Sequence, residues 1–326
     1  MIDVTEMRDR PLSPAEKKRL EKFKNRRGRK SPSKVPARLA RTSAFAPKRS
    51  RLNTDSGFER LYVVPGHSVI RVSGRELGTQ HRDTIYAVFR LPSKRTTQRV
   101  EQKTGRHSLP FTTIREVTTT WRKLLQAMNR TEHTNNLMTL LEVFEDIKKV
   151  VFTIFEGGDQ VAIAEAVKNH NLVELQRQGK AGAMGSLIDS VLWEGLELDS
   201  EVVIRFGDWS AEMIERAKLV SLNADVQFAL KSDHAKTFWP YIDSMNNHHY
   251  VDEEVLAALA GRDLWGELED KVSRGQFRKD CKQAFDDMVR VGGITEYRVE
   301  VTGSGRRKSR RYHYSHGMTG QLDLPI

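Results

Sequence analysis

The pattern of hydrophobic and polar positions divides the chain after residue 50 into two stretches with the same order of elements. In the first stretch, apolar residues recur every three or four positions in three segments, which indicates helices with one buried face. These segments are 79–91, 118–128 and 134–149. Apolar runs then indicate strands at 150–155, 186–193 and 201–206. Residues 157–182 are ambiguous, and we expect a short helix followed by the loop QGKAGAMG.

The second stretch repeats this order. Its helical segments are 233–245, 252–260 and 274–291. The third is the longest, and Gly292 and Gly293 follow it as helix-ending residues. Its apolar face consists of Phe277, Cys281, Ala284, Phe285, Met288 and Val289. An alternating strand at 297–301, a glycine-containing turn and a returning strand with Tyr312 and Tyr314 complete the stretch.

Three helices followed by a β-hairpin is the element order of a winged helix. The predicted fold class is therefore α+β, with two tandem winged-helix domains. The predicted organisation is a disordered basic tail over 1–50, a first winged-helix domain over 51–215, a second over 216–316 and a flexible C-terminal tail over 317–326. The N-terminal stretch is assigned to a tail because prolines interrupt it and its apolar residues are too sparse to form a core.

Charge is distributed unevenly between this tail and the rest of the chain. The 326 residues carry a net charge of +11. Residues 1–50 hold 16 Lys and Arg against 5 Asp and Glu, so the charges of the remaining residues balance. Such a tail favours a polyanionic partner, and we expect sequence-independent phosphate binding that weakens with salt. A solubilising tail or a localisation arm is the alternative.

The sequence lacks the patterns that are typical of several other classes of protein. No apolar run approaches the roughly 18 residues of a membrane span, and the basic N-terminus has no apolar signal segment. Cys281 is the only cysteine, which excludes an internal disulfide and a zinc finger and favours a reducing compartment. No phosphate-binding loop of the P-loop type occurs. We therefore expect no enzymatic activity, no catalytic residues, no cofactor, no metal and no membrane association.

The polar face of segment 274–291 suits base recognition, because arginine and lysine pair with guanine edges and glutamine with adenine. Its candidate residues are Arg274, Gln276, Arg278, Lys279 and Lys282. The turn of the following hairpin adds a dense basic cluster suited to phosphates or a minor groove. This cluster consists of Arg306, Arg307, Lys308, Arg310 and Arg311. A basic helix joined to a basic wing favours DNA binding over the alternative of a solvated helix face.

The first domain has its basic residues elsewhere. Its third helix carries Glu142, Glu145 and Asp146 and is a poor phosphate-binding face. A loop with five basic residues precedes the second helix. These residues are Lys94, Arg95, Arg99, Lys103 and Arg106. We expect either auxiliary DNA binding through this loop or self-association of the first domain.

The last six residues, QLDLPI, resemble the hexapeptide with which proteins bind the bacterial sliding clamp. The resemblance implies that Gln321 makes polar contacts and that three apolar side chains fill a groove. These side chains are Leu322, Leu324 and Ile326. A frayed or core-docked tail is the alternative.

Several runs within 40–315 resemble replication initiators of broad-host-range plasmids. Arg41-Thr42-Ser43-Ala44-Phe45 and the run 70–77 resemble the opening of that family. GSLIDSVLWEG (185–195) and FRKDCKQAFDDMVRVGGI (277–294) resemble later segments, the second of them the family's second recognition helix. The basic tail and the loop at 94–107 depart from the family pattern, and Cys281 replaces an aliphatic residue.

The resemblance implies tandem winged-helix domains that bind directly repeated double-stranded origin sites, called iterons. It also implies origin opening, recruitment of the host initiator and replicative helicase, plasmid copy control, and a first domain that contributes homodimerisation. The C-terminal hexapeptide adds the sliding clamp as a partner. The protein is accordingly expected in the bacterial cytoplasm.

Two other functions agree with the same residues. A winged-helix transcriptional repressor would bind an operator and have no replication partners. A nucleic-acid-binding protein driven by its tail would show little preference among duplexes. It would also lose most of its binding without residues 1–50.

Overall fold

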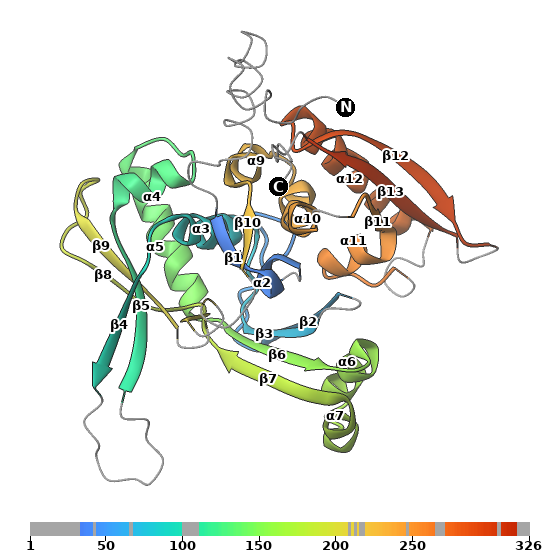
Figure 1. The fold of residues 1–326 in the computed structure, drawn as a ribbon, viewed down its shortest axis with the longest axis horizontal. Coiled ribbons are helices and arrows are strands. Elements are labelled where there is room, and N and C mark those ends of the chain that lie inside the picture. The colour runs from blue at the N-terminus through green and yellow to red at the C-terminus, as the bar shows by residue number, and fades with distance from the viewer. Residues whose placement is uncertain are drawn as a thin grey trace, which may run out of the picture.

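The computed structural model describes residues 33–41, 44–64, 68–99, 111–207, 210–211, 214, 219–245, 248–264, 271–304 and 308–317 (Figure 1). The expected basic tail up to residue 32 and the expected C-terminal tail from residue 318 lie outside the described residues. Among the described residues, no helix combines the length and the apolar character that crossing a membrane requires.

The second domain has the winged-helix order that the sequence predicts. Its elements are α10 (Asp233–Ser244), β11 (Tyr250–Asp252), α11 (Glu253–Leu259), α12 (Lys271–Arg290), β12 (Ile294–Thr302) and β13 (Ser309–His316). β13 lies between β11 and β12 in an antiparallel sheet. The apolar face of α12 packs into the domain core, where Phe277 and Phe285 are 0% exposed. The ring of Phe285 stacks on that of Tyr312 in β13, with 4.9 Å between centroids.

The first domain also contains three helices followed by strands. The helices are α3 (Thr79–Arg90), α4 (Trp121–Ala127) and α5 (Thr134–Lys148). A sheet of the order β2-β3-β6-β7 packs with them. Its strands are β2 (Phe58–Val64), β3 (Ser68–Gly74), β6 (Val151–Gly157) and β7 (Gly179–Gly185). Two short helices between β6 and β7, α6 (Gln160–Lys168) and α7 (Leu172–Gln178), lie at one end of this strand pair (Figure 1).

The expected loop QGKAGAMG was wrong, because most of it forms β7. The segment gives no strand pattern because its side chains are small, and it pairs with β6 through its backbone. A Cβ atom at Gly182 would lie 2.8 Å from the carbonyl oxygen of Ile154, so glycine permits this close pairing. β6 is therefore paired with β7 on one side and with β3 on the other.

A second sheet of the first domain has the order β4-β5-β9-β8. Its strands are β4 (Lys94–Arg99), β5 (Phe111–Thr120), β8 (Ile188–Trp193) and β9 (Glu201–Phe206). The expected loop at 94–106 thus begins as a strand, and the helix predicted from residue 118 begins three residues later. Thr120 ends β5 and caps α4, because its side chain accepts a hydrogen bond from the backbone nitrogen of Lys123.

The assignment of residues 33–50 to the tail was wrong, because they belong to the first domain. β1 (Ser33–Pro36) pairs with β10 (Leu219–Leu222), and α2 (Ala37–Arg41) follows β1. Val35 and Phe45 are 0% and 1% exposed in the core. The apolar residues of this stretch are too few to form a core alone, but they complete one that distant segments supply.

Two hydrophobic cores divide the chain. The first extends to Leu222, and the second begins at Val226 in α9 (Ala224–Ala229). A third, small cluster lies where α6 covers the strand β3.

Buried polar groups connect the two domains. Arg82 of α3 is 2% exposed and donates hydrogen bonds to the carbonyl oxygens of Lys236 (2.8 Å) and Phe45 (3.0 Å). Its neighbour Asp83 forms an ion pair with the ammonium group of Lys236 and accepts a hydrogen bond from Gln227 Nε2 at 3.0 Å. α3 is therefore tied to α9 and α10 by groups that cannot exchange their partners for water.

Candidate nucleic-acid interface

α12 presents a polar face to solvent. Gln276, Lys279 and Lys282 are exposed on this face. Gln276 donates a hydrogen bond to Asp280 Oδ1 at 2.9 Å, which is a surface contact. Within the described part of the chain, neither Lys279 nor Lys282 forms an ion pair. The structure thus leaves these two cations accessible to a polyanion.

Contacts near both ends of α12 hold this face in place. Near the first turn, Arg274 Nη2 donates to the carbonyl oxygen of Leu264 at 3.2 Å. In the last turn, Asp287 accepts hydrogen bonds from the backbone nitrogens of Lys231 (2.7 Å) and Ser232 (2.8 Å). A recognition surface on a helix held in this way is pre-organised for binding. Arg274 therefore has a structural contact at the position where base reading was predicted.

Arg278, a further predicted base-reading residue, is bound to a buried carboxylate. Its Nε donates to Glu253 Oε1 at 2.6 Å, and its Nη2 donates to Glu253 Oε2 at 2.9 Å. Nη2 also lies 3.4 Å from the carbonyl oxygen of Lys308 in the turn of the wing. The hydrogen bonds with Glu253 raise the pKa of Arg278 above its ordinary value. Arg278 therefore joins α12, α11 and the wing, and it can position the wing against the helix.

The basic residues of the wing have different surroundings. Arg311 Nε donates to Asp252 Oδ1 at 2.7 Å, and its guanidinium lies 4.2 Å from the ring centroid of Tyr250. Arg311 therefore joins β13 to β11, and its bonds with Asp252 raise its pKa. Lys308 is exposed, and its side chain forms no ion pair within the described residues.

The other basic residues of the wing are less accessible or undescribed. Arg310 is partly buried on β13. Arg306 and Arg307, at the tip, lie outside the described residues. Among the described members of the basic cluster, Lys308 is therefore the one most accessible to a ligand.

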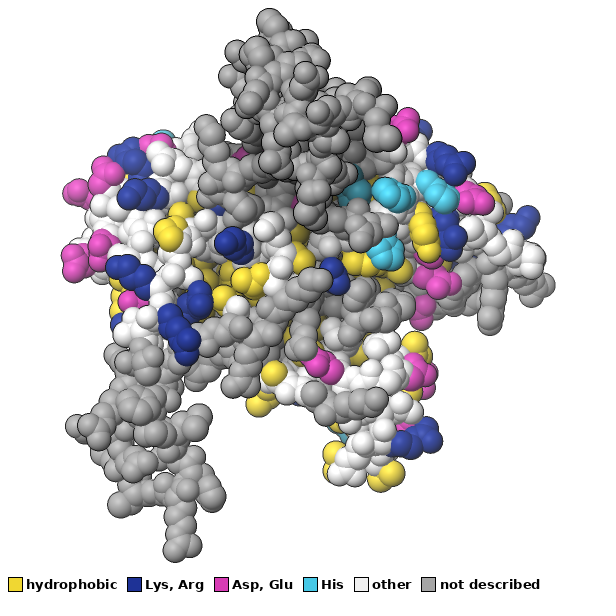
Figure 2. All heavy atoms as spheres, viewed as in Figure 1, with side chains coloured by type: hydrophobic (Ala, Val, Ile, Leu, Met, Phe, Trp, Pro, Cys, Tyr) yellow, Lys and Arg dark blue, Asp and Glu magenta, His cyan; other side chains and the backbone are white. Residues whose placement is uncertain are grey.

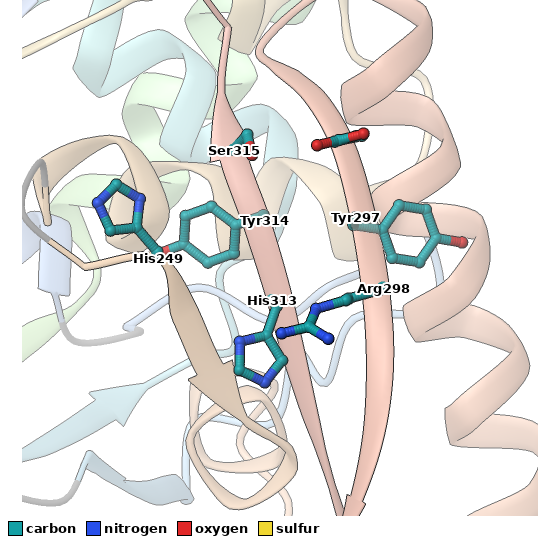
Figure 3. Close-up of a pocket in the computed structure, with 7 residues that line it drawn as sticks. His249, Tyr297, Arg298, His313, Tyr314 and Ser315 are labelled. Carbon is teal, nitrogen blue, oxygen red and sulfur yellow. The ribbon is translucent and has the colours of Figure 1, made fainter.

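A hollow of about 320 Å³ lies along the second-domain sheet, between His249 and the strands β12 and β13 (Figure 3). Arg298 of β12 lies opposite His313 of β13 and is exposed. Arg298 is a cation that the sequence prediction omitted. Alternate residues of a strand face opposite sides, so Arg298 faces away from the side of Tyr297 and Val299. This alternation could have revealed Arg298 as a candidate from the sequence. Among the described residues, no cluster of His, Cys, Asp or Glu is arranged to hold a metal ion.

Three of the basic residues predicted for the first domain lie on β4, whose hairpin with β5 projects from the molecule (Figure 1). Lys94 and Arg95 are exposed on β4. Arg99 ends the same strand. Lys103 and Arg106 lie outside the described residues. The third helix, α5, uses its carboxylates internally, because Asp146 pairs with Arg75 and Glu145 with Lys149.

Acidification is expected to destabilise the second domain through His234. Burial against Phe238 and Phe277 lowers the pKa of His234, although the nearby carboxylates act in the opposite direction. The unfolded chain has a His pKa of about 6.5, so the folded state favours the neutral ring. The contribution of neutral His234 to the stability of the folded state is complete above the unfolded-state pKa. It is lost as the pH falls through the folded-state pKa.

Thermal unfolding at about pH 7.5 and about pH 5.5 tests this expectation. The wild-type protein should lose stability at the lower pH, and His234→Asn should lose less. His81 of the first domain also has a pKa lowered by burial, so part of the pH dependence should remain in this variant. An unchanged pH dependence in His234→Asn would contradict the assignment.

Comparisons with known proteins identify the fold. No protein-family model and no curated protein matches the sequence. The crystal structure of domains 2 and 3 of RctB is similar, with a TM-score of 0.50 and 12% identity over 86% of this chain and 98% of that one. A second structure of RctB domains 2–3 has a TM-score of 0.42 and 12% identity, over 84% and 95% of the chains. The Pi initiator protein in complex with iteron DNA has a TM-score of 0.42 and 10% identity, over 62% and 81%.

The first of these similarities shows that the chain has the fold of RctB domains 2 and 3. Together with the observed element order, it defines an α+β protein of two tandem winged-helix domains. This confirms the fold class predicted from the sequence.

Proposed function

We propose that the protein is a non-enzymatic replication initiator that binds repeated double-stranded DNA sites. The observation that carries this proposal is the exposed pair Lys279 and Lys282 on α12, next to a wing whose turn is bound to the same helix by Arg278. In a winged helix, the third helix enters the major groove while the wing contacts the flanking backbone. Lys279 and Lys282 are the candidates for groove contacts, and Lys308 is the candidate for a phosphate.

The similar structures and the sequence support the choice of an initiator. One neighbour, the Pi initiator protein, is described in complex with iteron DNA. The runs within 40–315 resemble plasmid initiators independently of the structure. We extend the proposal to origin opening, copy control, recruitment of the host initiator and helicase, and clamp binding through Gln321 and the apolar residues of the C-terminal hexapeptide. The first domain would add contacts through Lys94 and Arg95 or would form the homodimer.

Fluorescence anisotropy with the full chain tests DNA recognition. The duplex upstream of the protein's own gene is compared with a shuffled duplex at about 50 and about 200 mM salt. We expect roughly a thousandfold preference or more for the native duplex, the range of specific binders. Equal and salt-sensitive binding to both duplexes would favour the tail-driven alternative.

Lys279→Gln and Lys282→Gln are each expected to weaken binding of the native duplex. Each should reduce the slope of log affinity against log salt by about one unit, because one phosphate or base contact is lost. Lys123→Gln on α4, an exposed lysine of the first domain, is the matched control and should change neither quantity. The same loss in all three variants would point to a general charge effect and contradict the assignment of α12.

A winged-helix repressor remains the second candidate, because it would bind DNA through the same helix and wing. Replication of a plasmid that carries only the cognate origin separates the two functions. An initiator supports this replication when supplied in trans, whereas a repressor does not.

A further inference from the structure

The strand β8 is an edge of its sheet with an unusually apolar surface. Only β9 pairs with it within the described residues. Leu192, Trp193 and Leu196 are 48%, 46% and 48% exposed, so three large apolar side chains lie open within five residues. An edge strand with an exposed apolar surface is a template for binding another polypeptide segment.

The indole of Trp193 is held in place from the protein side. It packs against the buried Trp121, with 6.4 Å between ring centroids. Trp121 Nε1 in turn donates a hydrogen bond to the carbonyl oxygen of Gly195 at 3.1 Å. The exposed part of Trp193 is therefore pre-organised, which lowers the entropy lost when a ligand covers it.

Acidic residues surround these apolar side chains. The stretch 187–204 contains five Asp and Glu and neither Lys nor Arg. Asp199 pairs with Arg122 at 2.7 Å. The other four acidic residues are exposed, and none forms an ion pair within the described part of the chain. They are Asp189, Glu194, Glu197 and Glu201.

By contrast, two carboxylates of the second domain are neutralised. Glu253 pairs with Arg278, and Asp252 with Arg311. Figure 2 shows acidic side chains along the left edge of the molecule, over the ends of β8 and β9. This surface, residues 189–201, repels DNA and suits a basic peptide, and we call it the acidic edge.

We propose that the acidic edge binds residues 17–30 of the same chain. This segment, KKRLEKFKNRRGRK, contains nine Lys and Arg, one Glu and two large apolar residues, Leu20 and Phe23. Its composition complements the acidic edge in both charge and apolar content. Phe23 is ten residues from Ser33, where the described chain begins, so an extended connection spans up to about 35 Å.

Binding at the acidic edge would compete with DNA for the same basic residues. Duplex DNA of any sequence offers phosphates to this segment, and the acidic edge offers carboxylates in their place. The acidic edge would thus reduce the affinity of the protein for DNA of any sequence, while the contacts of α12 with DNA remain unchanged. The inference concerns a contact within the protein and does not depend on the proposed DNA site.

Photochemical cross-linking in the full chain tests the proposal without DNA. Phe23 is replaced by the photoreactive amino acid benzoylphenylalanine, and adducts are mapped by mass spectrometry after digestion. We expect adducts within 189–201 in monomeric chains at low salt. Adducts that map only to other regions, or only between two chains, would overturn the proposal.

Variants of the acidic edge provide the second part of the cross-linking test. The combined change Asp189→Asn, Glu194→Gln, Glu197→Gln and Glu201→Gln should reduce the adduct yield at least severalfold. All four side chains are exposed and without ion pairs in the described chain, so thermal unfolding should stay near the wild-type temperature. Glu165→Gln with Glu296→Gln, two exposed acids elsewhere, is the control and should keep the full yield. An unchanged yield in the four-residue variant would overturn the proposal.

Discussion

Replacing Arg278 with alanine is expected to lower the free energy of unfolding of the second domain by about 3 kcal/mol, the lower end of the range for breaking a buried ion pair. Glu253 is 0% exposed, and two hydrogen bonds from Arg278 compensate its charge. Without them, the carboxylate stays buried, and among the described residues the side-chain donor that it retains is the hydroxyl group of Ser309, at 3.5 Å. We choose the lower end because the Arg278 side chain is 24% exposed, so water can partly replace it.

Hydrogen exchange of segment 294–316 in increasing urea measures this loss where it is expected. The wing should open at lower urea in Arg278→Ala, because Arg278 also contacts the turn of the wing at Lys308. Combining Arg278→Met with Glu253→Leu should restore part of the stability, since removing both charges leaves none unpaired. If Arg278→Ala instead keeps its stability and loses only sequence preference, then Arg278 reads bases, as the sequence alone predicts.

Replacing Asp83 with alanine is expected to separate the unfolding of the two domains. Asp83 and its partner Lys236 have side chains only 10% and 7% exposed, and the buried Arg82 lies next to them. Loss of Asp83 leaves the buried ammonium group of Lys236 without its carboxylate, at a cost of about 3–5 kcal/mol. Because these groups lie between the domains, the cost falls on the interface more than on either core.

Calorimetry of the full chain distinguishes this result from a general loss of stability. We expect two transitions in Asp83→Ala. The transition temperature of the second domain should lie closer to the wild-type value than that of the first domain. The control is Asp225→Ala, which removes a more exposed interdomain partner of Arg90 at 2.8 Å. Its cost should be about 1 kcal/mol or less, as for surface ion pairs. Equal costs for both substitutions would show that burial of Asp83 does not matter.

The two domains differ in how well their sequences predicted them. In the second domain, the stripe from Phe277 to Met288 repeats at helical spacing, and α12 includes the expected segment except for its last residue, Val291. In the first domain, β7 and β4 escaped prediction, because glycine-rich or polar strands carry no alternation of apolar residues. Such strands form because a neighbouring strand supplies their hydrogen bonds, and that neighbour is distant in the sequence.

The same distinction applies to the candidate interface. The sequence by itself determined the three helices and the hairpin of the second domain, the buried face of α12 and the candidate cations, because these depend on residue type and local spacing. Only the tertiary structure decided which cations remain accessible. It brings Glu253 to Arg278, Asp252 to Arg311 and Asp83 to Lys236, while Lys279 and Lys282 acquire no such partner among the described residues. The physical reason is that an ion pair depends on distances between residues far apart in the chain, which local periodicity does not encode.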